Sequence, residues 1–118
     1  GYDIIGCEIN RKTAENARKN LRHFNYEAEV ITGDIQDIDD SFDASIVDLP
    51  YGNFSFKNDE NQLKIIRNAI RISKKIVLAS SEDIRDELVQ ENLKIIDHCK
   101  IGKNKNGDFF RYIWVCEE

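Results

Sequence analysis

The stretch Ile46-Val47-Asp48-Leu49-Pro50-Tyr51-Gly52 decides how the chain is built. The apolar run over residues 44–47 predicts a buried strand, because valine and isoleucine favour pleated, buried backbone. Pro50 cannot donate a hydrogen bond to a continuing ladder, so the strand is expected to end near Asp48. In open α/β sheets, ligands bind at the carboxyl ends of the strands. Asp48, Pro50 and Tyr51 are therefore candidate site residues.

Length and composition are those of one globular domain. The chain has 118 residues, of which 41% are hydrophobic and 33% are charged. No apolar run approaches the roughly 20 residues that span a bilayer, and no segment resembles a signal peptide, so a cytoplasmic location is expected. The net charge of −5 argues against a surface that binds nucleic acid strongly by itself.

No metal site is predicted. Cys7, Cys99 and Cys116 lack the close pairing of metal ligands and lie in apolar, strand-like runs, so we expect small buried thiols. The acidic loop over residues 34–43 lacks the glycine and the terminal glutamate of a calcium-binding loop.

Hydrophobic periodicity predicts alternating strands and helices. Asn10 is expected to cap the first helix, Ser80 and Ser81 the third, and Asn106-Gly107 to form a turn. The alternation predicts an α/β fold with a mostly parallel sheet, covered on both faces and completed by an antiparallel C-terminal strand. The expected strands are residues 2–7, 29–32, 44–47, 75–79, 93–101 and 109–116, and the expected helices are residues 11–24, 59–72 and 82–92.

The last two expected strands carry aromatic and basic residues. Trp114 and its aromatic neighbours should pack in the core rather than stack on a base. Basic residues exceed acidic ones in this hairpin, by five to two, and they either steer nucleic-acid phosphates or lie in solvent. The basic residues are Lys94, Lys100, Lys103, Lys105 and Arg111, and the acidic ones are Asp97 and Asp108.

Three acids stand at the ends of successive expected strands. Glu8 ends the first, Gly33-Asp34 follows the second, and Asp48 ends the third. The stretch from Asp48 to Tyr51 resembles the Asp/Asn-Pro-Pro-Tyr/Phe motif of methyltransferases that use S-adenosylmethionine (SAM) to modify exocyclic amino groups of bases. Leu49 replaces the first proline of that motif.

A longer set of motifs resembles the catalytic domain of THUMP-associated RNA methyltransferases. It comprises Gly6-Cys7-Glu8-Ile9-Asn10, then Ala14, Ala17 and Asn20-Leu21, then Gly33-Asp34, and finally Asp48-Leu49-Pro50-Tyr51-Gly52. The resemblance implies a Rossmann-like class I methyltransferase fold, SAM as cofactor, and RNA as substrate. Members of this family methylate N2 of guanosine in tRNA, so tRNA is the implied target.

The resemblance also implies a role for each site residue. Glu8, followed by Ile9, would accept hydrogen bonds from the ribose hydroxyls of SAM, and Asp34, followed by Ile35, would read its adenine. Asp48, which also borders the cofactor, and a backbone carbonyl would accept the two N–H bonds of the target amine and aim its lone pair at the methyl group. Tyr51 would stack on the base.

One departure from the family concerns the start of the chain. The family's glycine-rich loop follows its first strand and should precede Tyr2, but only Gly1 stands there. We therefore expect residues 1–118 to be a partial catalytic domain that lacks the first strand and helix, with RNA captured by an upstream domain. The strands left without a neighbour should expose their edges, through which a homodimer could form.

Three other readings remain open. DNA adenine-N6 methyltransferases share the motif at Asp48. A non-catalytic, methyltransferase-like module that scaffolds a partner is the alternative from another class. A nicotinamide dehydrogenase would also use Glu8 on a ribose, but the stretch from Asp48 to Tyr51 has no role there.

Overall fold

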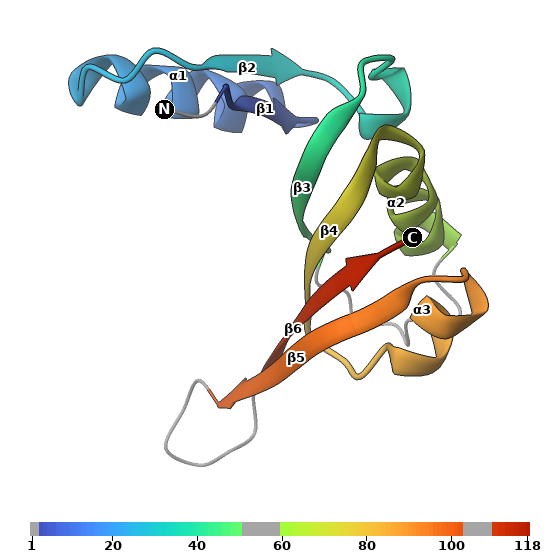
Figure 1. Ribbon diagram of the computed structural model, residues 1–118. Helices are drawn as coiled ribbons and strands as arrows, with labels where there is room; N and C mark the ends of the chain where they lie inside the picture. Colours follow the sequence, from blue (N-terminus) through green and yellow to red (C-terminus); the bar gives the residue numbers. More distant parts are fainter. Residues whose placement is uncertain (1–2, 51–59, 103–109) are drawn as a thin grey trace. The chain divides into compact units, whose positions relative to one another are not determined.

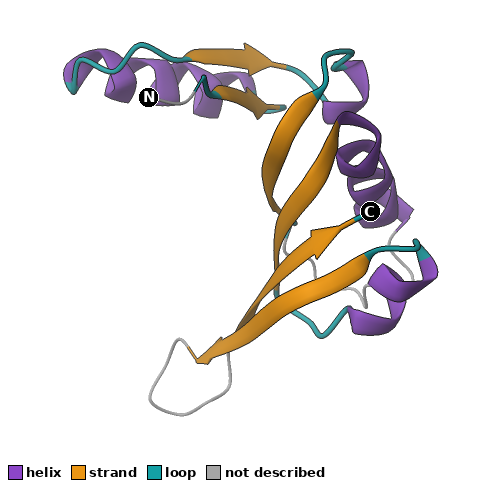
Figure 2. Cartoon of the chain, viewed as in Figure 1, coloured by secondary structure: helices purple, strands orange, loops and turns teal. Residues whose placement is uncertain are grey.

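The computed structural model describes residues 3–50, 60–102 and 110–118 (Figure 1). The chain divides into two compact units, residues 1–38 and 39–118. In the order of the chain, strands and helices alternate as the hydrophobic pattern predicts (Figure 2). Tyr51 and the predicted Asn106-Gly107 turn lie outside the described residues.

Unit 1 is a β-α-β unit. Strand β1 (Ile5–Glu8) pairs in parallel with β2 (Glu29–Thr32), with Glu8 opposite Thr32, and helix α1 (Arg11–His23) connects them. A short 3-10 turn (Ile35–Asp37) follows β2. The first strand begins later than the predicted residue 2 and extends one residue further, to Glu8. Glu8 and Asp34 therefore lie at or just beyond the carboxyl end of a parallel pair of strands.

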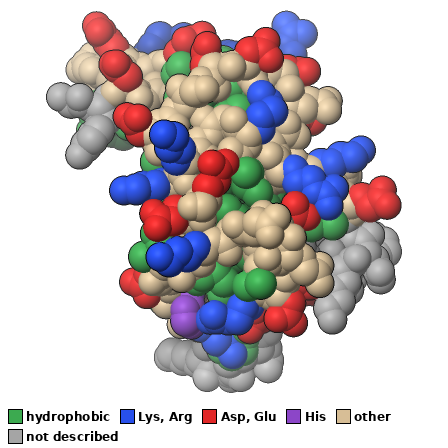
Figure 3. Space-filling model, turned by 45° about the vertical axis from the view of Figure 1, so that its right-hand side comes forward, with side chains coloured by type: hydrophobic (Ala, Val, Ile, Leu, Met, Phe, Trp, Pro, Cys, Tyr) green, Lys and Arg blue, Asp and Glu red, His purple; other side chains and the backbone are tan. Residues whose placement is uncertain are grey.

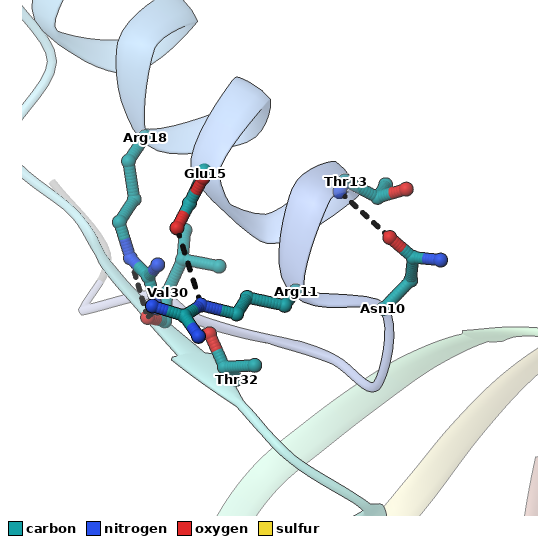
Figure 4. Close-up of polar contacts among 7 residues, drawn as sticks. All are labelled: Asn10, Arg11, Thr13, Glu15, Arg18, Val30 and Thr32. Carbon is teal, nitrogen blue, oxygen red and sulfur yellow. Dashed lines mark hydrogen bonds and ion pairs between the residues drawn. The ribbon is translucent and has the colours of Figure 1, made fainter.

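Helix α1 is fixed at its start and along its side (Figure 4). The side chain of Asn10 accepts the backbone N–H of Thr13 at 3.0 Å, which confirms the predicted N-cap. Arg18 donates to the carbonyl oxygen of Val30 at 2.6 and 3.1 Å and to the hydroxyl of Thr32 at 2.7 Å. The guanidinium thus ties the helix to the end of β2.

Unit 2 contains a four-stranded sheet in the order β3-β4-β6-β5. Strands β3 and β4 pair in parallel, and β6 runs antiparallel to both β4 and β5, which confirms the predicted antiparallel C-terminal strand. Its elements are β3 (Phe42–Asp48), α2 (Glu60–Ile72), β4 (Ser73–Ser80), α3 (Arg85–Gln90), β5 (Lys94–Gly102) and β6 (Phe110–Glu117).

The core of unit 2 lies on one face of this sheet, where α2 and α3 both pack (Figure 1). Trp114 is 1% exposed there, as predicted for a core residue. The neighbouring core side chains are Ile66, Ala69, Ile76, Leu78, Ile84, Leu88 and Cys116.

The opposite face is not covered by α2 or α3, the described helices of this unit. Ile46 is 87% exposed on this face, and its register neighbour Val77 is half-buried. The reason is topological. Two right-handed crossovers that advance in the same direction along a sheet, from β3 to β4 and from β4 toward β5, place their helices on the same side.

The third helix is shorter than predicted, and its predicted caps are wrong. Helix α3 begins at Arg85, whose backbone N–H donates to the side chain of Asp83 at 3.1 Å. Strand β4 ends at Ser80 and α3 begins only at Arg85, so neither Ser80 nor Ser81 lies at the start of that helix. The Ser80 hydroxyl instead accepts the indole N–H of Trp114 at 3.0 Å and donates to the carbonyl oxygen of Glu82 at 2.7 Å.

Of the three thiols predicted to be buried, only Cys116 is buried, whereas Cys7 and Cys99 are exposed. Cys99 pairs with Ile113 in the register of β5 and β6, on the uncovered face. Burial raises the pKa of Cys116 to about 11. Partial burial, with the carboxylates of Asp34 and Glu8, raises the pKa of Cys7. Both thiols are therefore held protonated near neutral pH.

Candidate functional site

The sheet holds the backbone in place where β3 ends. Asp48 is the last residue of β3 and pairs with Ala79 of β4. The next backbone N–H, from Leu49, donates to the carbonyl oxygen of Ala79 at 2.9 Å, and the Leu49 side chain is 2% exposed. Leu49 is therefore anchored on the covered side of the sheet, whereas Asp48 and Pro50 are exposed.

A buried glutamine holds the backbone at Pro50. The side-chain amide of Gln62, on α2, donates to the carbonyl oxygen of Pro50 at 2.7 Å, and Gln62 is only 7% exposed. This contact was not predicted from the sequence. The available signal was a polar residue on the buried side of the predicted helix 59–72, since a buried amide normally has a hydrogen-bond partner.

An arginine from the last strand holds the carboxylate of Asp48. The Nη2 atom of Arg111, on β6, lies 2.5 Å from Oδ1 of Asp48. The arginine side chain is 17% exposed and the aspartate side chain 63% exposed. The sequence places Arg111 among the basic residues of the hairpin, which are expected either to steer phosphates or to lie in solvent. The observed ion pair with Asp48 corrects this prediction for Arg111.

Glu8 and the Gly33-Asp34 stretch have neighbouring backbones at the ends of β1 and β2. The backbone N–H of Gly33 donates to the carbonyl oxygen of Glu8 at 2.9 Å, so the Gly33-Asp34 stretch continues directly beside the end of β1. The Glu8 carboxylate accepts the backbone N–H of Asn10 at 3.2 Å, and the Asp34 carboxylate accepts that of Gln36 at 3.1 Å. These bonds orient both carboxylates, and each carboxylate oxygen can accept further donors.

Two apolar residues flank these acids. Ile9 follows Glu8 and is 71% exposed, and Ile35 follows Asp34 and is half-buried. The candidate residues thus form two local groups. Glu8, Ile9, Asp34 and Ile35 belong to unit 1, and Asp48 and Pro50 belong to unit 2.

Within residues 3–50, 60–102 and 110–118, no group of three or more His, Cys, Asp or Glu side chains has the arrangement of a metal site. In the same residues, no helix has the length and apolar character needed to cross a membrane. On the face shown in Figure 3, acidic and basic side chains are interspersed.

Part of the chain is similar in sequence to a known tRNA methyltransferase. No family model matches the chain. A tRNA (guanine(10)-N2)-dimethyltransferase from Methanothermobacter thermautotrophicus is 33% identical over 70 residues, a match that covers 57% of this chain and 21% of the relative. The match therefore spans about a fifth of that enzyme's length.

Solved structures give a broader match. A magnesium protoporphyrin IX methyltransferase from Synechocystis, solved with bound SAM, has a TM-score of 0.78 at 13% identity and covers 100% of this chain and 61% of its own. A Pyrococcus abyssi tRNA (uracil-54, C5)-methyltransferase has a TM-score of 0.76 at 18% identity, and the match covers 98% of this chain and 29% of that enzyme's chain. TrmK of M. capricolum has a TM-score of 0.72 at 17% identity, with 96% and 50% covered. The chain has the α/β, Rossmann-like fold of these methyltransferases.

Proposed function

We propose that the chain is part of a SAM-dependent methyltransferase that methylates an exocyclic amino group of a base in RNA, with N2 of guanosine in tRNA as the expected target. The observation that carries the proposal is the fixed segment Asp48-Leu49-Pro50 at the carboxyl end of β3. Its backbone is held by Ala79 and Gln62, and its carboxylate by Arg111. The partial similarity to a tRNA guanine-N2 dimethyltransferase supports the choice of RNA.

The two carboxylate acceptors at the ends of β1 and β2 suit the ribose and adenine of SAM. A ribose presents hydroxyl donors and an adenine presents an amino donor, and a carboxylate is a strong acceptor for both. We assign the ribose to Glu8 and the adenine amino group to Asp34. The exposed side chain of Ile9 and the half-buried side chain of Ile35 offer apolar surface for the adenine ring. When bound, SAM supplies an electrophilic methyl group attached to a positively charged sulfur atom.

The residues at the end of β3 match the needs of a base amine. The lone pair of an exocyclic amine is delocalised into the ring, so the amine reacts poorly unless its N–H bonds are held. In the proposed site, Asp48 accepts one N–H of the amine, and the backbone carbonyl of Leu49 or Pro50 accepts the other. Tyr51 supplies a ring against which the base stacks, an interaction that contributes about 1–3 kcal/mol per base in comparable sites. Positioning of this kind lowers the barrier to an in-line transfer.

A methyl-transfer assay tests the proposal. The full-length gene product is incubated with SAM labelled in its methyl group and with either unmodified tRNA or duplex DNA, and the nucleosides are then identified by mass spectrometry. The proposal predicts label in N2-methylguanosine from tRNA. Label in N6-methyladenine from DNA would favour the DNA methyltransferase reading. No label in either substrate would contradict the proposed activity and favour a non-catalytic module.

A further inference from the structure

The ion pair between Arg111 and Asp48 joins two strands that are not neighbours. Asp48 lies at the end of β3, and Arg111 lies on β6, 63 residues later in the sequence. Strand β4 runs between them, with Ala79 paired to Asp48 on one side and to Ile113 on the other. The arginine side chain must therefore cross β4 to reach the carboxylate.

The register explains how this crossing is possible. Arg111 is two residues from Ile113, so both side chains point to the same face of the sheet, the face on which Asp48 also lies. The residue of β4 between Asp48 and Ile113 is Ala79, whose methyl group leaves room for a long side chain above it. Arg111 is only 17% exposed, which indicates that its aliphatic part packs along the sheet while its head meets the acid.

We propose that Arg111 is a positioning residue that fixes the orientation of Asp48 for the target amine. The inference rests on the proposed function of Asp48. An aspartate that is 63% exposed at the end of a strand can rotate among several side-chain conformations. A charge-assisted bond to Oδ1 selects one of them. Because each carboxylate oxygen can accept more than one donor, the bond to Arg111 is compatible with an amine N–H at the same carboxylate.

The ion pair between Arg111 and Asp48 should matter more for catalysis than for stability. The net contribution of an ion pair with one largely exposed partner to stability is small. Loss of the pair should therefore change the stability of the fold little. Misplacement of a reacting group by about 1 Å, in contrast, can lower a rate on the order of 100-fold. Arg111 should therefore affect the rate of transfer much more than the free energy of unfolding.

The test measures steady-state methyl transfer by the full-length gene product carrying Arg111→Gln. We expect kcat to fall about 10-fold to 100-fold, with the KM for SAM within about twofold of wild type, because Glu8 and Asp34 are unchanged. Arg111→Lys keeps the charge but not the planar guanidinium, so its kcat should be intermediate. Arg71→Gln removes the same charge from an exposed position on α2 and should leave kcat unchanged.

A double-variant cycle distinguishes this role from a general effect. If Arg111 acts through Asp48, the variant carrying both Asp48→Asn and Arg111→Gln should be no slower than Asp48→Asn alone. A kcat for Arg111→Gln within twofold of wild type, or full additivity in the cycle, overturns the inference. Should Arg111→Gln fail to fold, Arg111→Lys decides: a lowered kcat with unchanged KM supports the inference, and a wild-type kcat overturns it.

The failure of the inference differs from that of the proposed function. If Asp48→Ala abolishes transfer while Arg111→Gln does not alter it, only the role of Arg111 is wrong. If the wild-type protein transfers no methyl group, or if Asp48→Ala keeps full activity, the proposed function of Asp48 fails and the inference fails with it.

Discussion

Ser80→Ala should destabilise unit 2, because it removes the acceptor of a buried donor. Trp114 is 1% exposed and Ser80 is 3% exposed, so water cannot replace the hydroxyl that accepts the indole N–H at 3.0 Å. Loss of a neutral hydrogen bond costs about 1 kcal/mol, and an unsatisfied buried donor raises the cost to about 1–3 kcal/mol. For a small domain with a urea m value of about 1–3 kcal/mol per molar, the unfolding midpoint should fall by on the order of 1 M.

The assay is urea unfolding followed by tryptophan fluorescence. Trp114 is the one tryptophan in the sequence, so the signal reports on the sheet that contains the altered contact. Ser81→Ala is the matched control, since it makes the same chemical change one residue later at a half-buried position. Equal midpoints for Ser80→Ala and Ser81→Ala would refute the reasoning that this hydrogen bond stabilises the core.

Three further predictions concern the site and the sheet edges. Tyr51→Ala should weaken RNA binding while Tyr51→Phe should not, because stacking requires the ring and not the hydroxyl; equal loss in both variants, measured by filter binding, would contradict this. Residues 1–118 alone should bind SAM weakly, because Glu8 and Asp34 supply acceptors only for its ribose and adenine in the proposed site; a micromolar Kd in calorimetry would be the opposite result. Residues 1–118 should also self-associate through the edge of β3, which pairs only with β4 in the described sheet and carries Ile46 at 87% exposure. Sedimentation should therefore show a dimer, and Ile46→Lys should weaken it. Val89→Lys, at an exposed apolar position on α3, is the control and should leave the dimer intact. A wild-type monomer at tens of micromolar would argue against this association.

Features that depend on neighbouring residues in the chain were predictable. The cap at Asn10, the bounds of β2 and the end of the strand at Asp48 follow from local patterns of residues three to seven positions long. The alternation of strands and helices was enough to give the fold class. The third helix was misplaced because Ser80 is a good helix cap in isolation, but in the structure it is the last residue of β4 and a partner of Trp114.

Contacts between distant segments could not be read from the sequence. The bond from Gln62 to Pro50 requires that α2 pack beside the backbone at the end of β3. The ion pair from Arg111 to Asp48 requires that β6 lie between β4 and β5, an order that no local pattern encodes. The uncovered face of the four-stranded sheet, in contrast, follows from the handedness of the crossovers and could have been predicted once the strand order was known.

The most direct test of the central claim is the rate of N2-guanosine methylation in tRNA by the full-length gene product and by its Asp48→Ala variant. Removal of a positioned polar group from a reacting centre costs about 2–4 kcal/mol, which is about 30-fold to 900-fold in rate. We expect N2-methylguanosine in tRNA treated with the wild-type protein and a loss of that size in the variant. Absence of N2-methylguanosine with the wild-type protein, or near-equal rates for the two proteins, would contradict it.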